Sequence, residues 1–115
     1  MSLQNIRAKT IGAKKQFKEI EFDFEGEKVF FRQPTRGQFR DIQKLSVKDD
    51  GFDFTAYQVW SVIRLTYDAK GERVFSDADF ESFMAEPTGG WLDEFSTKAM
   101  EALAGNTDPK PQPEN

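Results

Sequence analysis

The feature that most constrains this fold is a pair of adjoining strand-like segments rich in phenylalanine. From Lys18 to Phe24 apolar and charged side chains alternate, as in a strand that buries one face. The apolar members are Ile20, Phe22 and Phe24. Glu25-Gly26-Glu27 then predicts a turn with a residue of positive φ, and Lys28–Arg32 predicts the returning strand. Because an isolated two-stranded hairpin is only marginally stable in water, its aromatic face must pack on helices.

Two helices are predicted after the hairpin. Thr35 is placed to cap the first, with Gln38 three residues later in a capping-box arrangement. Its narrow apolar stripe consists of Phe39, Ile42 and Leu45. Asp53 is placed to cap the second, Phe54–Tyr67, which is the most apolar stretch and predicts a central helix contacted on several sides. The same residues also fit a strand, but the length without a turn signal favours the helix.

Two further helices complete the pattern. Ser76 is a predicted N-cap, with Asp77 and Asp79 in the first turn where they suit the helix dipole. The last helix is predicted over Trp91–Ala104, and Gly105 suits its C-terminal cap. The expected fold class is therefore α+β and mostly helical, a single small domain in which an N-terminal β-hairpin packs on about four helices.

Composition divides the chain into three parts. We expect a basic N-terminal arm or short helix over residues 1–15, a single α+β domain over 16–105, and a disordered Pro-rich tail over 106–115. Residues 1–18 carry five of the 16 basic side chains and none of the 20 acidic ones, a charge of +5 against −9 for the rest. The acidic body should repel nucleic acid, whereas the basic arm of one copy can meet the acidic body of the next.

The chain contains neither Cys nor His, which removes thiol nucleophiles, His-based general bases and Cys/His zinc sites. No phosphate-binding glycine loop is present, and Asp49–Asp53 predicts a turn and cap rather than a calcium loop. The hairpin carboxylates are expected on a solvated face: Glu21, Asp23, Glu25 and Glu27. No segment approaches the ~18 apolar residues of a membrane-spanning helix. We therefore expect no enzyme, no cofactor, no metal site, no nucleic-acid partner and no membrane span.

Four aromatic residues are candidate contacts with a partner or a second copy. Phe30 and Phe31 are adjacent on a strand, so they point to opposite faces and one must face away from the main core. An N-terminal helix folded over the hairpin would explain this equally well. Trp91 and Phe95 lie on the last helix, and Trp91, like Trp60, suits either a core or a contact.

The order of these segments resembles the tail assembly chaperones of long-tailed bacteriophages and prophages. An apolar helix leads through Asp68-Ala69-Lys70-Gly71 to Val74-Phe75, and Ser76-Asp77 then caps a short helix. An Ala85-Glu86-Pro87 break precedes a last helix that ends Ala102-Leu103-Ala104-Gly105. The resemblance covers roughly residues 17–105, and it includes the hairpin and the helix that starts after Pro34.

The resemblance implies a non-catalytic protein of the bacterial host cytoplasm, absent from the mature virion. Such a protein would bind the tape measure protein and keep it soluble before the tail tube polymerises, as a homo-oligomer and sometimes beside a longer form of itself made by ribosomal frameshifting. Three other interpretations stay open: a small interaction or adaptor module of another multi-protein assembly, a nucleic-acid-associated protein that uses the basic arm, and an enzyme without a recognisable active site.

Overall fold

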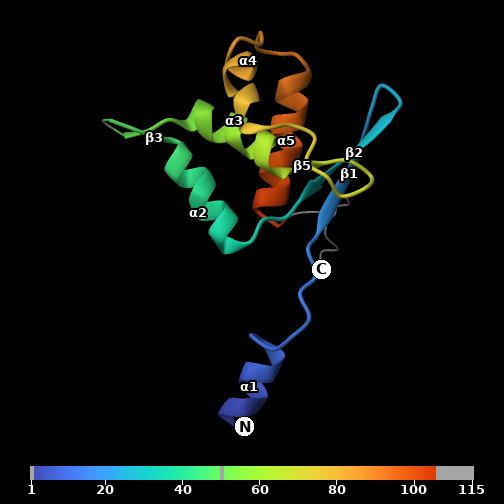
Figure 1. The fold of residues 1–115 in the computed structure, drawn as a ribbon, viewed down its shortest axis with the longest axis vertical. Coiled ribbons are helices and arrows are strands. Elements are labelled where there is room, and N and C mark those ends of the chain that lie inside the picture. The colour runs from blue at the N-terminus through green and yellow to red at the C-terminus, as the bar shows by residue number, and fades with distance from the viewer. Residues whose placement is uncertain (1, 50, 106–115) are drawn as a thin grey trace, which may run out of the picture.

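The computed structural model describes residues 2–49 and 51–105 of the chain. The predicted disordered tail (106–115) and Asp50 lie outside the described residues. Figure 1 shows helices gathered beside a small sheet, with the N-terminal helix standing away at one end. The elements are α1 (Leu3–Lys9), β1 (Glu19–Phe24), β2 (Glu27–Arg32), α2 (Arg36–Leu45), β3 (Val47–Lys48), β4 (Gly51–Phe52), α3 (Phe54–Leu65), β5 (Thr66–Tyr67), a 3-10 turn η1 (Asp77–Asp79), α4 (Phe80–Met84) and α5 (Trp91–Leu103). The expected mostly helical α+β class is confirmed.

The predicted hairpin is present, with β1 and β2 antiparallel and Ile20 opposite Phe31. Its two-residue turn has positive φ at both Glu25 (50°) and Gly26 (90°), the geometry that matches the twist of the flanking strands. The register gathers the apolar side chains on one face: Ile20, Phe22, Phe24, Val29 and Phe31. The expectation that this aromatic face packs on helices is confirmed, because β1 and β2 both contact α5.

The predicted central helix is confirmed as α3, which contacts α2, α4, α5 and β2. It ends two residues earlier than predicted, at Leu65. Thr66 turns into extended backbone, its hydroxyl donates to the Val62 carbonyl oxygen at 2.6 Å, and Thr66-Tyr67 pairs as β5 with β2. The helical and strand-like patterns of this segment therefore both reflect the structure, since its end completes the sheet β1-β2-β5.

The cap predictions at Thr35 and Asp53 are confirmed. Thr35 and Gln38 form the reciprocal capping box of α2, and the Asp53 side chain accepts from the Ala56 N–H at the start of α3. Ser76 is the N-cap residue of η1, where its backbone N–H donates to the Asp79 carboxylate at 2.9 Å. These contacts satisfy backbone donors that a helix start leaves unpaired, so they fix where each helix begins.

The centre of the core is the ring of Phe95 on α5, whose side chain is 3% exposed. Five aromatic rings surround it with centroid distances from 5.0 to 6.3 Å: Phe22, Phe24, Phe31, Phe75 and Trp91. Four of the five meet it edge to face, the arrangement that aromatic quadrupoles prefer. This cluster joins the hairpin, α5 and the segment before α4.

Replacing Phe95 with alanine should lower the free energy of unfolding by about 3–5 kcal/mol, because it removes buried area and leaves a cavity among five rings. Val74, which is 42% exposed, is the control, and Val74→Ala should stay within about 0.5 kcal/mol of the parent. Urea denaturation followed by circular dichroism measures both values. Equal losses in the two variants would contradict the central place of Phe95.

The hairpin turn makes a second prediction. At Gly26 a side chain would occupy the left-handed region, so Gly26→Ala should lower the free energy of unfolding by about 1–2 kcal/mol. Gly37, in α2, has only ordinary van der Waals contact around its Cβ position, and Gly37→Ala should raise stability by about 0.4–1 kcal/mol. The same denaturation experiment distinguishes the two signs. A gain at Gly26 would contradict the assigned turn geometry, and a loss at Gly37 would contradict its assignment as an unhindered helical position.

Candidate protein-binding surfaces

The structure places the four sequence-predicted contact residues in two different environments. Phe31 is fully buried, and Phe95 is buried at the centre of the core. Phe30 and Trp91 are half-buried. Neither Phe31 nor Phe95 offers exposed surface to a partner in this arrangement, and a contact role for the four residues stays a prediction.

Phe30 lies on the outer face of the sheet, as the adjacency of the two phenylalanines requires. It stands opposite Glu21 of β1 and Tyr67 of β5. The neighbouring Arg32 guanidinium lies 4.4 Å from the centre of the Tyr67 ring, a cation–π contact. No residue of α1 is buried, so the N-terminal helix does not supply a cover for this face.

Trp91 packs into the core from the first turn of α5. Its ring lies 5.0 Å from the ring of Phe95 and 5.4 Å from that of Phe83, and its Nε1 donates to the Glu86 carboxylate at 3.1 Å. Trp60 similarly stacks on Phe80 at 4.6 Å. Both tryptophan side chains therefore pack mainly against other aromatic rings of the same chain.

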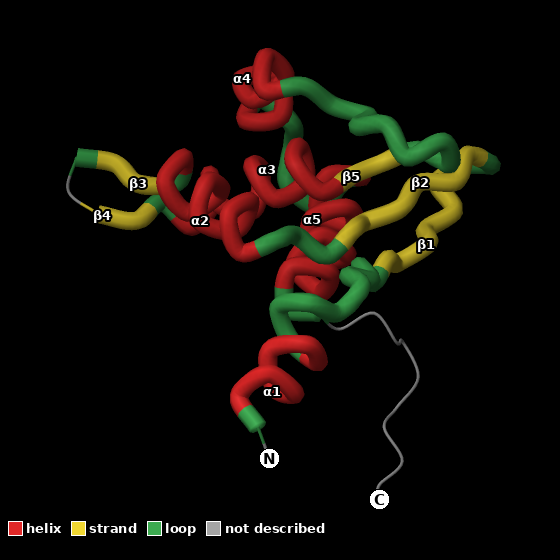
Figure 2. Tube along the Cα trace, turned by 60° about the horizontal axis from the view of Figure 1, so that its bottom comes forward, coloured by secondary structure: helices red, strands yellow, loops and turns green. Residues whose placement is uncertain are grey.

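The aromatic side chains with the largest exposed fractions lie at the end of the molecule far from the sheet. There β3 and β4 form a short projecting hairpin between α2 and α3 (Figures 1 and 2). Val47 and Phe52 are directly paired across it, and Phe52 and Phe54 both contact the Tyr57 ring, at 5.1 and 6.0 Å. We name these four residues the hairpin patch. Val47, Phe52 and Phe54 are each more than half exposed, which marks an unpartnered apolar surface.

Two apolar residues of the predicted helices have exposed side chains. Phe54 begins the central helix α3 as predicted, and Leu45 ends the apolar stripe of α2, but they are 55% and 38% exposed. Both lie next to the β3–β4 hairpin, at the end of α2 and the start of α3, and neither is covered by the sheet or α5. The sequence itself indicates this hairpin, because the turn-forming residues Asp-Asp-Gly lie between the apolar residues Val47 and Phe52.

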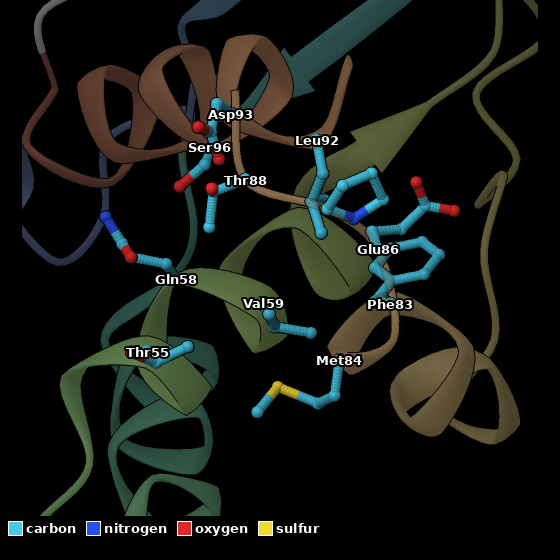
Figure 3. A pocket seen from close by; sticks show the side chains of 11 residues that line it. Thr55, Gln58, Val59, Phe83, Met84, Glu86, Thr88, Leu92, Asp93 and Ser96 are labelled. Carbon is cyan, nitrogen blue, oxygen red and sulfur yellow. The ribbon is translucent and has the colours of Figure 1, made fainter. Parts of the chain in front are cut away.

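A second surface feature is a groove between α3, α4 and the start of α5, with a volume of about 230 Å³. Figure 3 shows side chains from these helices and from the loop after α4 around it. We call it the α3–α5 groove, and its apolar lining includes Val59, Met84 and Leu92. Ligand pockets usually span ~300–1,000 Å³, so this groove suits one or two side chains better than a cofactor. It combines residues from three elements, and no single sequence motif could predict it.

An ion pair joins the C-terminal end of α3 to η1, outside the groove lining. Arg64 donates two hydrogen bonds to the Asp77 carboxylate, from Nε to one oxygen and from Nη2 to the other, each at 2.9 Å. Arg73 adds a third contact to Asp77 at 3.2 Å. Because η1 leads directly into α4, this pair fixes α4 against α3.

The described residues contain no group of three or more Asp or Glu side chains that could hold a metal ion. The four hairpin carboxylates are exposed as predicted, and one of them, Glu21, pairs with Lys28. Glu19 at the start of β1 pairs with Arg32. Within residues 2–49 and 51–105, no helix is long and apolar enough to cross a membrane. The hairpin patch and the α3–α5 groove both offer apolar contact area.

Comparison with known proteins identifies one informative likeness. No protein-family model and no curated protein sequence matches this chain. Its fold is similar to the solved structure of the bacteriophage HK97 tail assembly chaperone, with a TM-score of 0.57 and 18% identity. The match covers 96% of this chain and 100% of that chain. The resemblance inferred from the order of the elements is therefore confirmed at the level of the fold.

The Asp77 ion pair predicts how stability changes with pH. Hydrogen bonds from Arg64, and then from Arg73, hold the pKa of the Asp77 carboxyl below its usual 3.8. The folded state therefore binds this proton less readily than the unfolded state, so the contribution is present above about pH 4 and is lost as pH falls through the folded pKa. Asp77→Asn should lower stability at pH 7 and make its decline below pH 4 shallower.

Urea denaturation at pH 7, 4 and 3 measures this effect. Glu27→Gln is the control, because Glu27 is exposed and forms no ion pair within the described part of the chain. If Asp77→Asn and the parent lose stability in parallel between pH 4 and pH 3, the ion pair contributes nothing to the acid response.

Proposed function

We propose that this chain is a tail assembly chaperone of a long-tailed phage or prophage. It binds the tape measure protein, keeps it soluble while the tail tube assembles, and catalyses no reaction. The observation that carries the proposal is the fold shared with the HK97 chaperone over nearly the whole of both chains. A sequence without Cys or His supports a role in binding rather than catalysis.

The hairpin patch is the surface proposed to contact the client. Helical segments are recognised through apolar side chains at i, i+3, i+4 and i+7, which need a shallow apolar surface rather than a deep pocket. Val47, Phe52 and Phe54 supply such a surface on a projecting element. Several copies along one client would add their modest contacts, because tethered sites bind at high effective concentration.

The same proposal places the chain in the cytoplasm of the bacterial host and outside the mature virion. It also includes self-association, and a longer frameshifted form of the chain as a second partner. A chaperone of this kind acts before the tube closes around its client, so it must leave again. Modest apolar contacts, each reversible, suit that requirement better than one large interface.

The alternative is a small interaction or adaptor module of another multi-protein assembly. The exposed apolar side chains of the hairpin patch favour a protein partner in either case. The two functions differ in the client, and a direct test with the tape measure protein separates them.

The test is co-expression with the tape measure protein of the same phage or prophage. We expect that protein to be soluble and to co-purify with the parent chain. Val47→Ser/Phe52→Ser should lose most of the co-purified client, because it removes two exposed apolar side chains from the patch. Soluble client per mole of chaperone is measured by quantitative gel analysis.

Val74→Ser is the matched control, since Val74 is also exposed but lies outside the patch. Circular dichroism must show that all variants are folded. A client that stays insoluble with the parent chain refutes the tape measure assignment. A client that binds the patch variant as well as the parent refutes the proposed contact surface.

A further inference from the structure

The N-terminal arm is an amphipathic segment without a covering surface. Leu3 and Ile6 are 72% and 47% exposed, and three-residue spacing puts them on one face of α1. Ile11 follows beyond the helix and is 66% exposed. A helix of seven residues is marginal in water by itself, because isolated helices shorter than ~12–15 residues rarely persist. The arm therefore requires a surface on which its apolar face can be buried.

The α3–α5 groove is a surface of matching chemistry. Its apolar lining is bordered by the carboxylates of Glu86 and Asp93, and no Lys or Arg lines it. An adjoining hollow that shares Asp93 and Ser96 adds the carboxylate of Glu101. The arm carries Arg7, Lys9, Lys14 and Lys15 and no acidic side chain, so its charge is opposite to that of the groove.

The arm of the same copy is directed away from this groove. Figures 1 and 2 show α1 and α4 at opposite ends of the molecule, from two viewing directions. Between α1 and β1 the chain first forms a turn and then has no regular structure. This segment places the arm away from the body. A second copy can meet the arm there without any rearrangement of the fold.

We propose that the N-terminal arm of one copy docks in the α3–α5 groove of the next copy. The side chains of Leu3 and Ile6 enter the apolar lining at Met84 and Leu92. The basic side chains of the arm face the carboxylates at the rim. This contact specifies the self-association included in the proposed function, and it joins two different surfaces, so each copy keeps a free arm or groove for another copy.

Site-specific cross-linking tests the contact directly, because the chain has no native cysteine. Chains with Ile6→Cys and chains with Met84→Cys are mixed, one of them tagged, and oxidised with diamide. We expect a disulfide-linked heterodimer. The control replaces Met84→Cys with Val74→Cys, at a position of similar exposure (42% against 40%), and should give at least about tenfold less product.

One chain carrying both Ile6→Cys and Met84→Cys distinguishes contact between copies from contact within a copy. Docking on the next copy gives a ladder of disulfide-linked multimers on a non-reducing gel. A cyclised monomer as the main product shows that the arm occupies its own groove, and it refutes the proposal. Equal cross-linking at Val74→Cys also refutes it.

Sedimentation velocity over a range of concentrations provides a second measurement. Leu3→Ser/Ile6→Ser, or Met84→Lys alone, should weaken self-association at least about tenfold, since tenfold corresponds to the lost burial of roughly one apolar side chain. Mixing these two variants leaves one intact arm and one intact groove, so it should restore dimers but no larger species. The matched controls, Gln4→Ser/Asn5→Ser and Val74→Lys, should associate as the parent does.

A parent chain that stays monomeric at every concentration refutes the contact. These measurements need no client, so the two proposals fail separately. Self-association with an insoluble tape measure protein contradicts the proposed function alone. A soluble client held by a strictly monomeric chain contradicts the arm–groove contact and self-association, but it leaves client binding intact.

Discussion

The packing of the Phe95 ring against the aromatic face of the hairpin is the interaction on which the rest of this structure depends. Neither strand of a two-stranded hairpin has enough partners to be stable alone, and α5 supplies the missing surface. The same ring contacts Phe75, which brings the segment before α4 to the core. The core therefore joins elements that are distant in the sequence, and the ends of the molecule are left with few apolar neighbours.

That distribution of packing explains where the exposed apolar side chains are. α2 and the β3–β4 hairpin extend away from the aromatic cluster, so Val47, Phe52 and Phe54 are not covered by it. At another end of the molecule the N-terminal arm extends away from the body, and no residue of α1 is buried. The groove between α3, α4 and α5 is also open, and its α4 side lies at the end of the molecule opposite to the arm. Two apolar surfaces and one apolar segment thus remain available for other molecules.

The proposed function relies on many weak contacts rather than on one strong contact. The groove is small, the hairpin patch is shallow, and the carboxylates of the sheet are solvated or paired with basic neighbours. Each contact alone gives low affinity, but repetition along a long client raises the total because the second and later contacts are effectively intramolecular. The likeness to the HK97 tail assembly chaperone is a likeness of fold.

The sequence by itself determined the hairpin, the helix starts at Thr35, Asp53 and Ser76, and the central position of α3, because alternation, caps and apolar density are local signals. Phe30 and Phe31 had to face opposite ways for the same reason. Only the tertiary structure decided that Phe31 and Phe95 are buried together, that Thr66-Tyr67 joins the sheet, and that the groove exists. Each of these depends on which distant residues become neighbours, and pairing between distant segments leaves no periodic trace in the chain.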